Sequence, residues 1–116
     1  MTDAIGFEVS LDQPFEQAVE IVTAALKTQG FGVLTKIDVK ATLKEKLDKD
    51  FRPYVILGAC NPALAYRALS QSAEIGMMLP CNVTVEADGA EASIVRVSDP
   101  DVFMQVGKFK DDEVMR

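Results

Sequence analysis

Two Cys-Asn dipeptides are the part of this sequence whose residue types could do chemistry. The chain has two cysteines, Cys60 and Cys81, and each is followed by an asparagine, Asn61 or Asn82. A cysteine at the end of a strand, just before a helix N-terminus, can have a lowered thiol pKa and become a reactive or metal-binding thiolate. Cys60 fits this position, because Asn61-Pro62 is typical of a helix start. If the two flanking strands pair antiparallel, the two cysteines meet.

Three interpretations of these cysteines remain open: inert core residues, a redox or soft-metal thiol site, and a catalytic nucleophile. Cysteine is among the residues most often buried, which supports the first. The chain has no histidine, so no Ser–His or Cys–His pair and no imidazole ligand can form. A zinc site made of Cys60 and Cys81 alone would be two ligands short. The sequence therefore predicts no catalytic residue and favours binding over catalysis, with no particular cofactor specified.

Arg52 is a further candidate, since it stands between an aromatic residue and a proline. It could hold an acidic partner or a ligand carboxylate; the alternative is a structural salt bridge to Asp38 or Asp50. Residues 36–67 carry seven basic and four acidic side chains, so a small anion could be attracted there. Asn61 has a structural alternative as a helix cap, and Asn82 as a residue that begins a strand.

Composition limits the class of protein. The 116 residues, 48% of them apolar, suffice for one domain with one core. A net charge of −6 argues against nucleic-acid binding. No apolar run approaches the roughly 20 residues that span a bilayer, and the first residues do not resemble a signal peptide. We expect a cytoplasmic protein with free thiols and no membrane partner.

The elements that would position these residues follow from periodicity. Strands are predicted at 5–9, 31–37, 54–60, 81–87 and 92–97, the last two joined by a turn at Asp88-Gly89. Helices are predicted from 14 to Gly30, after Asp38, after Asn61 and from Ser98 or Asp99.

Some details of these elements are also predicted. Ser10 or Asp12 is expected to cap the first helix. Phe31, Val33, Thr35 and Ile37 are expected on one side of their strand. The closing hairpin excludes a purely parallel sheet and predicts an α+β fold. Residues 1–107 are expected to form the domain, and 108–116 a polar tail.

Several segments together resemble the family called domain of unknown function 302, over roughly residues 5–105. The segments include Gly30-Phe31-Gly32-Val33-Leu34-Thr35, Ile37-Asp38-Val39-Lys40-Ala41-Thr42-Leu43-Lys44, Phe51-Arg52-Pro53-Tyr54, Leu57-Gly58-Ala59-Cys60-Asn61-Pro62 and Leu79-Pro80-Cys81-Asn82-Val83. The resemblance implies a fold similar to the TATA-binding protein: a curved, mainly antiparallel sheet of about five strands with helices packed on it. It also implies a homodimer, and no settled activity.

The resemblance marks eight positions as signature residues without making them catalytic: Asp38, Lys40, Arg52, Tyr54, Cys60, Asn61, Cys81 and Asn82. We expect a domain that binds a small ligand, a soft metal or a protein partner near Cys60 and Cys81. One alternative is a thiol oxidoreductase, which requires the two Cα atoms to lie about 4.4–6.8 Å apart. Another is a purely structural homodimeric interaction module, with Met77-Met78 as a candidate contact surface.

Overall fold

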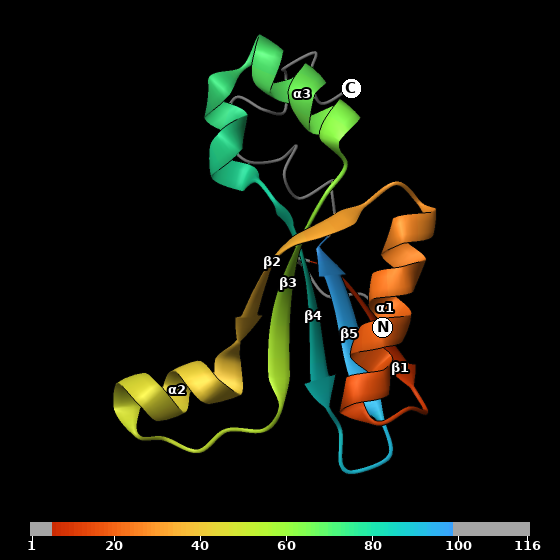
Figure 1. The fold of residues 1–116 in the computed structure, drawn as a ribbon, viewed down its shortest axis with the longest axis vertical. Helices are drawn as coiled ribbons and strands as arrows, with labels where there is room; N and C mark the ends of the chain where they lie inside the picture. The colour runs from red at the N-terminus through yellow and green to blue at the C-terminus, as the bar shows by residue number, and fades with distance from the viewer. Residues whose placement is uncertain (1–5, 99–116) are drawn as a thin grey trace.

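The computed structural model describes residues 6–98, which fold into an α+β domain (Figure 1). The elements in chain order are β1 (Gly6–Leu11), α1 (Phe15–Thr28), β2 (Gly32–Asp38), α2 (Val39–Leu47), β3 (Tyr54–Cys60), α3 (Pro62–Gln71), the 3-10 helix η1 (Ala73–Met78), β4 (Cys81–Ala87) and β5 (Ser93–Ser98). The five strands occur where the sequence predicts them, to within two residues. The helix predicted from Ser98 or Asp99, and the tail at 108–116, lie outside the described residues.

The strands form one sheet in the order β1-β5-β4-β3-β2, and every neighbouring pair is antiparallel. The predicted hairpin joins β4 to β5. Asp88 N–H donates to the Ala92 carbonyl at 2.9 Å, and Gly89 has a φ of 79°, a conformation that glycine adopts without a steric penalty. The exclusion of a purely parallel sheet is thus confirmed, as is the mainly antiparallel sheet that the family resemblance implied.

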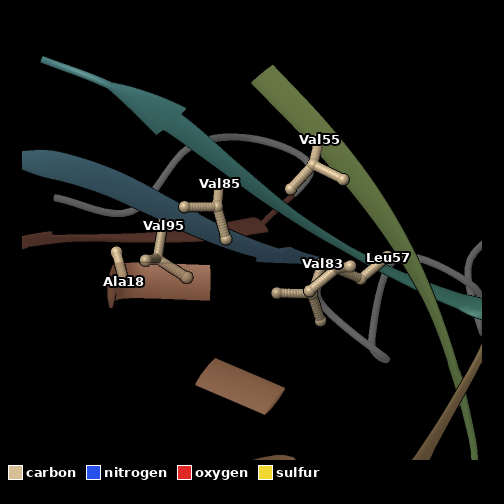
Figure 2. Packing of buried hydrophobic residues seen from close by; sticks show 6 residues of the cluster. All are labelled: Ala18, Val55, Leu57, Val83, Val85 and Val95. Atoms are coloured by element: carbon tan, nitrogen blue, oxygen red, sulfur yellow. The ribbon is translucent and has the colours of Figure 1, made fainter. Parts of the chain in front are cut away.

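The core lies between one face of the sheet and α1. Side chains alternate between the two faces of a strand, and the inward set of β3, β4 and β5 is buried with Ala18 of α1 (Figure 2). The six residues of this cluster are at most 4% exposed: Ala18, Val55, Leu57, Val83, Val85 and Val95. Figure 1 shows α1 lying across this face, with α2 to the side and α3 and η1 beyond one end of the strands. The apolar side chains of α1 recur at helical spacing, and Phe15, Val19, Val22 and Leu26 pack against the cluster.

Two of the predicted helix starts are confirmed by side-chain caps. Asp38 Oδ1 accepts a hydrogen bond from the N–H of Ala41 at 2.9 Å. Asn61 Oδ1 accepts one from the N–H of Leu64 at 3.2 Å. For α1 the predicted caps, Ser10 and Asp12, are wrong: β1 continues to Leu11, and the N-cap is Pro14, which makes no side-chain bond.

One prediction about β2 is also wrong in detail. Val33 pairs with Ala59, but Thr35 pairs with Gly58, because a bulge lies between Val33 and Thr35. The extra residue of a bulge breaks the alternation of side chains. Val33 therefore packs against the core, whereas Thr35 lies on the opposite face, beside Gly58.

Within residues 6–98, none of the helices combines the length and apolar character needed to cross a membrane.

Candidate functional site

The face of the sheet opposite α1, which we call the outer face, carries small residues at the end where β3 finishes and β4 starts. The register pairs Gly58 with Thr35 on one side and with Asn82 on the other. Pro80 lies over Gly58, because a Cβ placed on that glycine would stand 2.7 Å from Pro80 Cγ and closer still to Thr35 Oγ1. Small side chains here let the segment that enters β4 lie close to the sheet.

A pocket of about 250 Å³ opens beside this contact. Four consecutive residues, Met77 to Pro80, line it together with Asn82 of β4 and Ser98 of β5. Val83 pairs with Val97, so Asn82 and Ser98 are neighbours on adjacent strands. The pocket therefore has an apolar wall and two neutral hydrogen-bonding side chains, the usual combination in a site for a small molecule.

Cys60 and Cys81 come close together, as the predicted strand pairing requires. Ala59 pairs with Cys81, so Cys60 lies one residue beyond that pair. By alternation Cys81 belongs to the core face with Val83, and Cys60 to the outer face with Gly58. Two cysteines whose Cβ atoms point to opposite faces cannot be bridged without backbone movement, so this register disfavours a disulfide. Both thiols are free and half-buried.

Burial raises the pKa of the Cys81 thiol, and the nearby negative charge of a Cys60 thiolate raises it further. Cys81 is therefore held as a neutral thiol near pH 7, which is the unreactive form. The Cys81 thiol therefore resembles a packed side chain more than a nucleophile.

The metal hypothesis rests on these two sulfurs alone. Residues 6–98 hold no group of three or more His, Cys, Asp or Glu side chains suited to a metal ion. Two thiolates do not complete a tetrahedral zinc site, and Cys81 would have to lose its proton before it could ligate. The described residues thus offer a soft metal two donors, on opposite faces of the sheet.

Arg52 and Tyr54 lie far from the cysteines, at the opposite end of β3. Cys60 is six positions after Tyr54 along that strand, which is about 20 Å of extended chain. Arg52 Nε donates to Glu86 Oε2 at 2.5 Å, and the Arg52 guanidinium stacks 4.5 Å from the centre of the Phe51 ring. The structure does not bring Arg52 and Tyr54 together with Cys60 and Cys81.

Glu86 is the centre of an ion-pair network. Its side chain is 6% exposed, and its other carboxylate oxygen accepts from Arg96, which also pairs with Glu8 at 2.9 Å. The structural salt bridge expected for Arg52 exists, but the expected partners, Asp38 and Asp50, are wrong. Glu86 reaches Arg52 because β4 pairs with β3, placing Glu86 opposite Tyr54.

Asp38 and Lys40 belong to the start of α2. Asp38 caps that helix and pairs with Val55 in the sheet, whereas Lys40 is exposed. Among the other bases of this region, Lys44 pairs with Asp48 at 3.0 Å and lies 3.5 Å from Asp50. Part of the positive charge expected to attract a small anion is thus neutralised locally.

Two groups of residues were missed by the sequence reasoning. Glu8, Glu86 and Arg96 occupy outward positions of alternating strands, where charged residues are normally solvated. Their pairing depends on the strand order, which no local pattern reveals.

Leu79, Pro80 and Ser98 line the pocket. Leu79 and Pro80 lie between Met78 and Asn82 in sequence, whereas Ser98 reaches the pocket only through the pairing of β5 with β4.

Comparison with known proteins places this fold in a family. A search of curated proteins finds no significant match. Among solved structures, the chain is similar to the uncharacterised conserved DUF302 protein from Bacillus stearothermophilus. The two are 28% identical with a TM-score of 0.80, over 97% of this chain and 85% of the other. The sequence profile of the family described as "Domain of unknown function DUF302" matches residues 7–115. The chain therefore belongs to the DUF302 family, as the sequence motifs predicted.

Proposed function

We propose that this domain binds a small molecule in the pocket between Met77–Pro80 and the outer face of β4 and β5. The observation that carries the proposal is the pocket itself: about 250 Å³, with an apolar wall facing the side chains of Asn82 and Ser98. Sites of this composition take up an apolar body and orient it with a few polar contacts. Methionine side chains adapt their shape to what they contact, so the wall can close around a ligand.

This site adjoins the Cys60/Cys81 corner but does not use the thiols as its walls. Pro80 and Asn82 line the pocket, and Cys81, between them in sequence, alternates to the other face of the sheet. The thiols are thus a neighbouring feature. The raised pKa of Cys81, from burial and then from the Cys60 charge, supports binding over thiol chemistry.

A fragment screen tests the proposal. Ligand-observed NMR with the full chain should yield binders that are lost when Asn82→Phe places a larger side chain in the lining of the pocket. The matched control is Thr23→Phe, at an exposed position of α1, which should retain the same binders. If no fragment is lost selectively in Asn82→Phe, the pocket is not the binding site.

A second candidate, a homodimeric interaction module, is supported by the surface of α3 and η1. These two elements stand beyond the end of the sheet (Figure 1), and Leu64, Tyr66 and Met77 on them are 52%, 75% and 78% exposed. Exposed apolar side chains on these two elements are suited to a contact with a second copy of the chain. Sedimentation distinguishes this candidate: Tyr66→Lys should dissociate a dimer, whereas Thr23→Lys should not.

A further inference from the structure

We infer that the ligand of the pocket is uncharged, a small apolar or aromatic molecule carrying a neutral hydroxyl or amide group. This inference rests on the proposed function and names the class of ligand for the same site. It differs from the small anion that the basic segment 36–67 would attract, because the pocket is built from residues 77–98.

The side chains that line the pocket are suited to a neutral ligand. The described residues that line the pocket are methionine, leucine, proline, asparagine and serine, and none of these side chains is ionisable. A charged group that leaves water without an oppositely charged partner or a set of hydrogen bonds loses more than it gains. The amide of Asn82 and the hydroxyl of Ser98 can each donate and accept hydrogen bonds. They therefore suit a neutral ligand group that is a donor, an acceptor or both.

The cation of β5 that shares the outer face with Ser98 is already paired. Arg96 stands two residues before Ser98 on the same face of β5, and its guanidinium is shared between Glu86 and Glu8. Turning Arg96 towards a ligand anion would leave the nearly buried Glu86 with one arginine fewer. The network therefore withholds this cation from the pocket.

Volume sets the size of the ligand. A cavity of about 150 Å³ accommodates benzene, so the pocket of about 250 Å³ takes on the order of ten non-hydrogen atoms by the same measure. A single ring with a two-atom polar substituent is the right scale.

Three compounds of nearly equal shape test the inference: 2-phenylethanol, phenylacetate and 2-phenylethylammonium. Each is titrated into the full chain at 0.15 M salt, which screens the field of the net charge of −6. Binding is followed by the methyl NMR signals of Met77 and Met78 and the side-chain amide of Asn82. The neutral alcohol should bind at least tenfold more tightly than either ion.

A variant with a charge in the wall provides the counter-test. Met77 is 78% exposed, so Met77→Lys should fold normally, and it should shift the preference towards phenylacetate at least tenfold. Ala24→Lys, at an exposed position of α1, should leave the original order unchanged.

The outcomes separate the two proposals. If either ion binds the natural chain as tightly as the alcohol, the inference about ligand charge is wrong while the pocket remains a binding site. If none of the three compounds moves the signals of Met77, Met78 or Asn82, and the fragment screen also finds no binder lost in Asn82→Phe, the proposed function itself fails.

Discussion

Arg52 and Glu86, 34 residues apart in sequence, are joined by a hydrogen bond of 2.5 Å from Nε to Oε2. The two side chains differ in environment: that of Arg52 is 52% exposed and that of Glu86 is 6% exposed. The arginine is held by the carboxylate and by the Phe51 ring beneath it. The carboxylate is held by two arginines, since Arg96 contacts its second oxygen. Glu86 therefore organises this part of the outer face.

Replacing Glu86 with glutamine should destabilise the fold by about 2 kcal/mol, because the substitution removes charge-assisted bonds from a nearly buried position. A glutamine keeps the size and one acceptor but cannot satisfy both Arg52 and Arg96 with charge. The measurement is urea unfolding followed by circular dichroism. Glu91→Gln, at an exposed site in the β4–β5 connection, is the control and should change stability by less than about 0.5 kcal/mol. Equal losses in the two variants would contradict the role assigned to Glu86.

The same carboxylate should make stability depend on acidity. Burial alone raises the pKa of Glu86, but the hydrogen bonds and charges of Arg96 and Arg52 outweigh it and lower the pKa below its usual value. A lowered folded-state pKa gives stability that is present above the unfolded value, about 4.3, and is lost as the pH falls through the folded value. Unfolding free energies measured between pH 6 and pH 2 should fall more steeply in the natural chain than in Glu86→Gln. Parallel curves would show that Glu86 does not contribute to acid unfolding.

The sequence predicts the helices, strands and turns of this fold better than it predicts how the strands pair. Caps such as Asp38 and Asn61 are local signals, because the side chain bonds to a backbone N–H three residues away. The helical spacing of apolar residues in α1 and the turn at Gly89 are also signals that depend only on residues close in sequence. The bulge in β2 was missed, because its extra residue is accommodated by pairing with β3 and not by any preference of its own sequence.

The candidate site shows the same limit. The proximity of Cys60 and Cys81 follows from antiparallel pairing of two predicted strands, and the register agrees. The alternation of apolar and polar residues in 81–87 assigns Cys81 to the same face as Val83 and Val85. Residues 54–60 are apolar on both faces, so the sequence does not specify the face of Cys60. The pocket combines two strands with the end of η1 and the two residues that follow it, so periodicity in the sequence does not reveal it.

Asn61 is a signature residue that caps α3, and two substitutions test whether this structural role accounts for it. Asn61→Ala should destabilise the fold by about 1 kcal/mol, because the N–H of Leu64 loses its acceptor. Asn61→Asp retains an acceptor at the same position and should restore most of that stability. Thermal unfolding measures both. A loss of similar size in Asn61→Asp would mean that the amide nitrogen, and not the capping oxygen, is the group that matters.

The alkylation rate of Cys81 should reflect its environment. In a Cys60→Ser variant, the pKa of Cys81 should stay above that of a free thiol, about 8.5, because burial is the larger cause of the shift and the Cys60 charge the smaller. Rates with iodoacetamide, measured from pH 6.5 to 10, give the pKa; the same variant unfolded in urea is the reference. A folded value at or below the unfolded one would contradict the assignment of Cys81 as a neutral thiol near pH 7.

Two strand glycines provide a matched test of the close contact beneath Pro80. A Cβ at Gly58 would lie 2.7 Å from Pro80 Cγ and closer to Thr35 Oγ1, whereas a Cβ at Gly32 meets no atom within 4 Å. Gly58→Ala should therefore cost about 2 kcal/mol through overpacking. Gly32→Ala should be neutral or stabilise by up to about 1 kcal/mol, because alanine has less backbone freedom to lose on folding.

The comparison also tests how the pocket is built. If Pro80 must move to admit a methyl group at Gly58, the wall from Met77 to Pro80 moves with it, and the methyl NMR signals of Met77 and Met78 should shift in Gly58→Ala but not in Gly32→Ala. Unfolding in urea supplies the stabilities, and the methyl spectra supply the geometry. Unchanged methionine signals together with an unchanged unfolding free energy in Gly58→Ala would show that Pro80 does not pack on Gly58. The small residues of the outer face would then have no part in shaping the pocket.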